Sequence, residues 1–159
     1  MKIWILLLAV FLAAGCVQQQ EGAQDEAVAQ QESPAEISPA ASPQTIAKNY
    51  YRYDRAAYEQ ALSGGKIVFL DFYASWCPIC NAEKPDIVQA FNEIDYDNVV
   101  GFQVHYNDDQ TNDDDRSLAR EFGITYQHTK IIIKDGTVAL KSLEVFSADR
   151  VKAEIAGLV

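Results

Sequence analysis

Two cysteines separated by two residues, Cys77 and Cys80, are the side chains best suited to chemistry in this chain. They fall where a strongly apolar segment gives way to a segment with helical spacing, and residues i and i+3 share one face of a helix. The unpaired N–H groups and positive dipole end of a helix N-terminus stabilise a thiolate on the first cysteine. Pro78 suits this place, because the first helical turn has no partner for its missing N–H. Since a thiolate is the attacking species in thiol–disulfide exchange, the spacing predicts redox chemistry.

The elements that position this pair follow from periodicity and turn residues. The apolar stretch Ile67–Tyr73 is interrupted only by Asp71, as expected of a central parallel strand covered on both faces. Ligands of open α/β sheets bind beyond the carboxyl ends of such strands, which is where Cys77 begins a helix. Asp135-Gly136 is a strong signal for a two-residue hairpin. The predicted elements are a helix capped by Asp54, strand 67–73, helix 77–94, strand 99–106, a helix capped by Thr111 or Asn112, strands 130–134 and 137–141, and a helix capped by Ser147.

These elements predict an α/β fold, in which a βαβ unit is followed along the chain by an antiparallel hairpin. The result is a mixed central sheet with helices on both faces. The folded domain is expected to span residues 46–159, a length that buries a substantial core.

The composition excludes several functions. The chain has 159 residues and a formal net charge of −10, which argues against nucleic-acid or anionic-lipid binding. Three cysteines are too few for a four-cysteine zinc site. His105 and His128 could join the cysteine pair around zinc, but the intervals of 24 and 22 residues fit no zinc-finger pattern.

Residues 69–80 read FLDFYASWCPIC and resemble the active-site segment of the thioredoxin superfamily. Pro85, five residues after Cys80, matches the proline that kinks the active-site helix of that family. Gly123-Ile124, the hairpin and the last helix follow in the family's order, so the resemblance covers residues 53–159 and implies a thioredoxin-like fold.

The resemblance also implies a role for each matching residue. Cys77 would be the attacking thiolate, and Cys80 the resolving thiol that breaks the mixed disulfide. Asp71 would be a buried acid whose pKa is raised by desolvation, so that it exchanges a proton with Cys80. Trp76 would cover the site and help to dock the substrate. The surroundings are completed by Pro78 and Ile79. No cofactor is implied beyond the redox-active disulfide, and the implied partners are protein thiol or disulfide substrates and a redox partner protein.

His128 marks a departure from the family, because it stands where a cis-proline is normally found. That proline loop presents backbone to the substrate and keeps metal away from the cysteines. Three interpretations stay open: a loop histidine without a special role, a protonated His128 that lowers the pKa of Cys77 or alters docking, and a neutral His128 that binds Cu(I) together with Cys77 and Cys80. Gln103 occupies the approximate place of the family's lysine, which could alter how Asp71 titrates.

The N-terminal residues are typical of an export signal. A basic start is followed by an unbroken apolar run over residues 3–14, too short to cross a bilayer. The run closes as Leu12-Ala13-Ala14-Gly15-Cys16, which resembles the lipobox of prokaryotic lipoproteins. Residues 1–15 would then be a signal peptide, and residues 16–45 a lipidated Cys16 followed by a disordered acidic tether. An ordinary cleaved signal and an uncleaved anchor are the alternatives, and all three export the domain.

Two functions follow from these patterns. The leading hypothesis is a membrane-tethered, extracytoplasmic thiol–disulfide oxidoreductase that uses Cys77 and Cys80. The alternative is a copper-binding metallochaperone-type module that adds His128 to the pair. A third, weaker possibility is a binding module that has kept the fold without turnover. The direction of electron flow and the physiological substrate do not follow from the residues.

Overall fold

A six-stranded sheet and four helices form the part of the chain that the computed structural model describes, residues 42–159. Along the chain the elements are β1 (Thr45–Ala47), β2 (Tyr50–Arg52), α1 (Arg55–Ser63), β3 (Ile67–Tyr73), α2 (Pro78–Glu93), β4 (Val99–His105), α3 (Asp113–Glu121), β5 (Thr129–Lys134), β6 (Thr137–Ser142) and α4 (Ala148–Ala156). The strand order across the sheet is β1-β2-β4-β3-β5-β6. Strands β2, β4 and β3 are parallel, whereas β1 pairs antiparallel with β2, β5 with β3, and β6 with β5. The predicted mixed sheet is thus confirmed.

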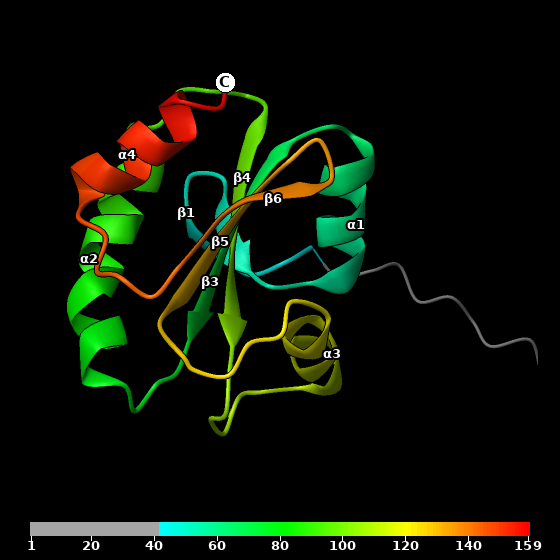
Figure 1. Ribbon diagram of the computed structural model, residues 1–159, viewed down its shortest axis with the longest axis vertical. Helices are drawn as coiled ribbons and strands as arrows, with labels where there is room; N and C mark the ends of the chain where they lie inside the picture. The colour runs from blue at the N-terminus through cyan, green and yellow to red at the C-terminus, as the bar shows by residue number, and fades with distance from the viewer. Residues whose placement is uncertain (1–41) are drawn as a thin grey trace, which may run out of the picture. The chain divides into compact units, whose positions relative to one another are not determined.

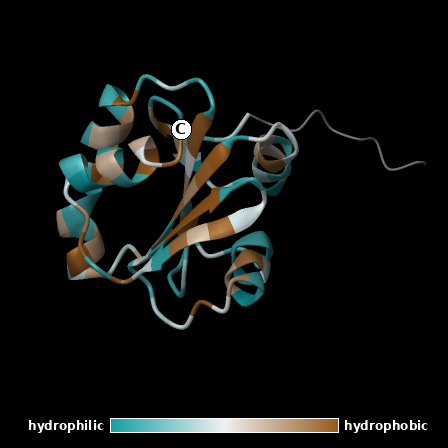
Figure 2. Ribbon diagram, turned by 45° about the horizontal axis from the view of Figure 1, so that its top comes forward, coloured by the Kyte–Doolittle hydropathy of each residue, from teal (hydrophilic) through white to brown (hydrophobic). Residues whose placement is uncertain are grey.

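The helices cover both faces of this sheet, as the sequence predicts. Figure 1 shows α2 and α4 on one face and α1 and α3 on the other. Phe69 packs with Phe91 and Ile155 on the first face, whereas Leu70 packs with Leu118 on the second. In Figure 2 the central strands are hydrophobic, while the helices carry both hydrophobic and hydrophilic residues. Because successive side chains of a strand point to opposite faces, β3 contributes to both cores.

Capping residues set the helix starts. The Asp54 carboxylate accepts a hydrogen bond from the first turn of α1, and the Ser147 hydroxyl does the same for α4. Asn112, one of the two predicted caps, begins α3 and forms a capping box with Asp115. Asp115 is fully buried and also accepts hydrogen bonds from Arg52 at 2.8 and 2.5 Å. The acidic start of α3 is therefore joined to β2 by a partly buried ion pair.

The N-terminal part of the fold differs from the prediction. Sequence periodicity missed β1 and β2, because three residues are too few to show an alternating pattern. Thr45, at the end of the predicted tether, already belongs to β1. The predicted signal peptide, Cys16 and most of the tether lie outside the described residues. Within residues 42–159, no helix combines the length and apolarity needed to cross a membrane.

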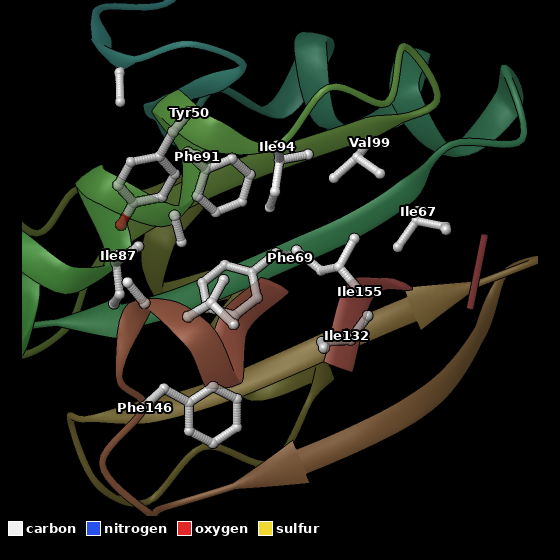
Figure 3. Packing of buried hydrophobic residues seen from close by; sticks show 14 residues of the cluster. Tyr50, Ile67, Phe69, Ile87, Phe91, Ile94, Val99, Ile132, Phe146 and Ile155 are labelled. Carbon is white, nitrogen blue, oxygen red and sulfur yellow. The ribbon is translucent and has the colours of Figure 1, made fainter. Parts of the chain in front are cut away.

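Tyr50 on β2 packs against the buried side of α2. Its ring stacks on Phe91 with a centroid separation of 4.9 Å (Figure 3). Both rings lie close to Gly101 of β4. A Cβ atom at Gly101 would lie 2.7 Å from Tyr50 Cδ2 and 2.8 Å from Phe91 Cε1. The absence of a side chain at Gly101 is what allows these two rings to close over the sheet.

Replacement of this glycine should therefore destabilise the domain. We expect Gly101→Ala to lower the free energy of unfolding by about 2 kcal/mol, because a methyl group there overpacks the core. Gly157→Ala is the matched control, since its Cβ would meet only ordinary contacts at 3.6 and 3.7 Å. Urea denaturation measures both variants, and equal stability of the two would contradict the packing argument.

Candidate active site

The two predicted cysteines form a disulfide at the N-terminus of α2. Cys77 is the N-cap residue of the helix, and its Sγ accepts a hydrogen bond from the backbone N–H of Cys80 at 3.2 Å. Both cysteines are buried beside Tyr73 and Ala74. Pro78 occupies the first turn, as predicted. The helix start thus directs its unpaired N–H groups towards the sulfur that would carry the thiolate.

Two apolar side chains stand out from the surface around this disulfide. Trp76 is 55% exposed and Ile79 is 52% exposed, although both flank buried Cys77. The Trp76 indole N–H donates a hydrogen bond to the carbonyl oxygen of Asn107 at 2.9 Å, which holds the ring in place. These two residues form an exposed apolar rim beside the disulfide, and the docking role predicted for Trp76 stays a prediction.

His105 supports the segment that precedes the disulfide. Its Nδ1 lies 2.7 Å from Asp108 Oδ2, and the same oxygen accepts a hydrogen bond from the backbone N–H of Ser75 at 2.9 Å. Burial opposes ionisation of Asp108, but the hydrogen bonds from Ser75, His105 and Thr111 hold its pKa below the usual value. His105 is therefore part of a clamp on the loop before Trp76.

Asp71 lies in the middle of β3, where it is 3% exposed. Its Oδ2 accepts a hydrogen bond from the Tyr50 hydroxyl at 3.1 Å. Burial raises the pKa of Asp71 to about 6, and the nearby positive charge of Lys130 limits the rise. The acid is thus buried with a raised pKa, as the resemblance implied.

Lys130 is a buried residue that sequence reasoning did not single out. In the sheet register, Asp71 lies between Gln103 on β4 and Lys130 on β5. The neighbour of Asp71 on β4 is the uncharged Gln103, whereas β5 supplies a cation from the opposite side. One signal was available, because alternation along β5 places Lys130 on the same face as core residue Ile132.

Glu83 is the second residue that the sequence reasoning missed. It lies one helical turn beyond Cys80, is buried, and forms an ion pair with Lys130. Its other carboxylate oxygen accepts a hydrogen bond from the backbone N–H of Phe146, in the segment before α4. A glutamate on the buried face of a helix was the available signal for a buried ionic contact.

His128 joins the same group. Its Nδ1 lies 2.9 Å from Glu83 Oε2, and its backbone N–H donates to the carbonyl oxygen of Phe72 at 2.6 Å. The residue has a φ of 67°, and no peptide bond among residues 42–159 is cis. The loop therefore turns through a left-handed residue at His128.

The copper interpretation finds no support in this arrangement. The His128 ring contacts Glu83 and Lys130, and no group of three or more His, Cys, Asp or Glu within residues 42–159 is arranged to hold a metal ion. The zinc combination is likewise not assembled there, because His105 contacts Asp108.

The comparison with known proteins agrees with this geometry. The family model described as thioredoxin matches residues 50–157, so the chain belongs to the thioredoxin family. It is 40% identical over 76 residues to chloroplastic thioredoxin F of Oryza sativa subsp. japonica, covering 48% of this chain and 37% of the rice protein. It is 26% identical over 104 residues to thioredoxin of Alicyclobacillus acidocaldarius subsp. acidocaldarius, covering 65% of this chain and 92% of that protein.

A solved structure shares the fold. The crystal structure of Trxlp from Edwardsiella tarda EIB202 superposes with a TM-score of 0.57 at 24% identity, covering 67% of this chain and 97% of that one. The predicted thioredoxin-like fold is confirmed.

The raised pKa of Asp71 makes stability depend on pH. The folded protein favours the protonated acid, so this contribution to stability is fully present below pH 3.8, is lost as the pH rises towards about 6, and stays lost at higher pH. We expect Asp71→Asn to raise the free energy of unfolding at pH 8 by up to about 3 kcal/mol and to have little effect at pH 4. Urea denaturation at the two pH values measures this difference. The exposed Asp109→Asn variant is the control, and an equal gain from it, or an Asp71→Asn gain that does not depend on pH, would contradict the burial argument.

Proposed function

We propose that the protein is a thiol–disulfide oxidoreductase that acts on protein thiols or disulfides through Cys77 and Cys80. The observation that supports this most directly is the disulfide at the N-terminus of α2, the helix that follows the strand holding buried Asp71. The chain spans 37% of the length of its rice relative, so its substrates and redox partner are part of the proposal. The exposed Trp76 and Ile79 provide the docking rim that a protein substrate needs.

In the reducing direction, the reaction needs two sulfur exchanges. The Cys77 thiolate attacks a substrate disulfide, so that a bond forms from Cys77 Sγ to one substrate sulfur and the other leaves as a thiolate. Cys80 then loses its thiol proton to the Asp71 carboxylate and attacks Cys77 Sγ. The Cys77–Cys80 bond forms, the second substrate thiolate leaves, and two electrons have passed to the substrate. A partner dithiol restores the reduced pair, and the reverse sequence oxidises a substrate dithiol.

The two cysteines should fail in different ways when replaced. Cys77→Ser should abolish disulfide exchange, because no thiolate remains at the helix N-terminus. Cys80→Ser should trap a mixed disulfide between Cys77 and the substrate, since the resolving thiol is gone. Insulin reduction and non-reducing electrophoresis measure the two effects. Full exchange activity in Cys77→Ser would falsify the proposed function.

We further propose that the protein is an exported lipoprotein, anchored to the extracytoplasmic side of a membrane through a lipid on Cys16. The pattern that supports this is the apolar run that ends at Leu12-Ala13-Ala14-Gly15-Cys16. A single acyl chain binds a membrane only weakly, whereas a diacylglycerol-modified cysteine supplies two chains and a stable anchor.

Fatty-acid labelling tests this anchor directly. In bacteria that express the full chain, we expect labelled palmitate to enter the protein and the protein to sediment with membranes. Cys16→Ala should lose both the label and the membrane fraction, whereas the matched variant Cys80→Ala should keep both. Unlabelled protein in the soluble fraction would overturn the lipoprotein proposal without affecting the redox proposal.

A further inference from the structure

Three buried ionisable side chains from three parts of the fold meet beside Asp71. Glu83 comes from α2, Lys130 from β5 and His128 from the loop that precedes β5. Lys130 Nζ forms an ion pair with Glu83 and lies 3.1 Å from His128 Nδ1 and 3.3 Å from His128 Nε2. Glu83 Oε2 also lies 2.9 Å from His128 Nδ1. The three side chains of this cluster are each 9% exposed or less, so they are almost sealed from water.

Lys130 is the member of the cluster that lies next to Asp71 in the sheet. Asp71 and Lys130 are paired across β3 and β5, so their side chains lie on the same face of the sheet. Lys130 stabilises the ionised form of Asp71, whereas the negative charge of Glu83 disfavours it. The charge on the cluster therefore acts directly on the proton affinity of the catalytic acid.

The other elements packed against this region carry few competing charges. Tyr50 on β2 donates its hydroxyl to Asp71, and Lys84 on α2 exerts a weaker attraction on the same carboxylate. Arg150 on α4 repels Lys130, but it is also paired with Glu144 and Glu154 on the surface. Lys130 Nζ also donates a hydrogen bond to the carbonyl oxygen of Glu144 at 3.1 Å.

His128 is the member of the cluster whose ordinary pKa lies closest to that of Asp71, so its charge is the one that changes in the acidic range. Burial and the charge of Lys130 lower the pKa of His128, while Glu83 opposes this shift. With His128 neutral, the Lys130 and Glu83 charges balance. When His128 takes a proton, the cluster gains one positive charge next to Lys130.

We propose that His128 is a positioning residue for the proton transfer of the redox site, coupled to Asp71 through Lys130 and Glu83 so that the two compete for protons. A proton on His128 stabilises the Asp71 carboxylate, and a proton on Asp71 leaves less negative charge to stabilise protonated His128. Interacting groups of this kind titrate in two separated steps that belong to the pair.

This coupling has a consequence for the resolving step, and that consequence rests on the proposed function. Asp71 must be ionised to accept the thiol proton of Cys80. Protonated His128 keeps Asp71 ionised below the pH at which the acid alone would be neutral. The chain thereby extends its resolving activity towards acidic pH.

Nuclear magnetic resonance on the oxidised full chain tests the coupling without any need for turnover. Carbon-13 in the Asp71 carboxyl group and nitrogen-15 in the imidazole rings are followed across pH 4–9. We expect two inflections for Asp71, of which one coincides with the titration of His128, separated by about one pH unit or more. Asp71→Asn assigns the carboxyl signal.

Variants separate coupling from simple packing. His128→Asn keeps a residue that tolerates the positive φ but cannot be protonated, so Asp71 should show one inflection. Glu83→Gln should move both titrations to lower pH, and Lys130→Met should move both to higher pH. His105→Gln replaces the other histidine, which contacts Asp108, and should leave the two Asp71 inflections in place.

Breaking a buried ion pair can unfold a protein, so two outcomes do not depend on the Glu83 and Lys130 variants. A single Asp71 inflection in the unmodified chain, or an Asp71 titration unchanged in His128→Asn, overturns the coupling. The rate at which Cys80 resolves a mixed disulfide is measured separately, and its acid limb should move to higher pH in His128→Asn. If coupling is seen but no protein disulfide is exchanged, the proposed function fails and the coupling stands.

Discussion

The position of β3 between β4 and β5 is the constraint on which the rest of the site depends. This strand is buried along its whole length and pairs with β4 on one side and β5 on the other. Its carboxyl end leads into the loop that carries Trp76 and Cys77, and its middle holds Asp71. Any shift of this strand by one residue would turn Asp71 and Phe69 to the opposite face and break both cores.

A buried acid in such a strand needs compensation from its neighbours. Tyr50 donates a hydrogen bond to Asp71, and Lys130 adds a positive charge. The buried charge of Lys130 is compensated by its ion pair with Glu83. The Glu83 carboxylate also contacts the His128 ring and accepts a hydrogen bond from the backbone N–H of Phe146. Asp71 thus belongs to a set of charged and polar groups that satisfy one another, which is the condition under which buried charges are tolerated.

The same set explains how the loop before β5 holds its shape. His128 turns the chain through its left-handed backbone conformation. Its backbone N–H donates a hydrogen bond to Phe72 of β3, and its ring contacts the carboxylate of Glu83 on α2. A titratable side chain thus links this loop to α2, the helix that begins at the disulfide.

The local sequence by itself determined the redox pair and the elements around it. The strand that carries Asp71, the helix that begins at Cys77 and the hairpin at Asp135-Gly136 are predictable because periodicity, caps and turn residues act over a few neighbouring residues. The Glu83–Lys130–His128 cluster and the short strands β1 and β2 were decided only by the tertiary structure. Glu83 and His128 are 45 positions apart and Tyr50 and Gly101 are 51 apart, so only the pairing and packing of the sheet bring them together.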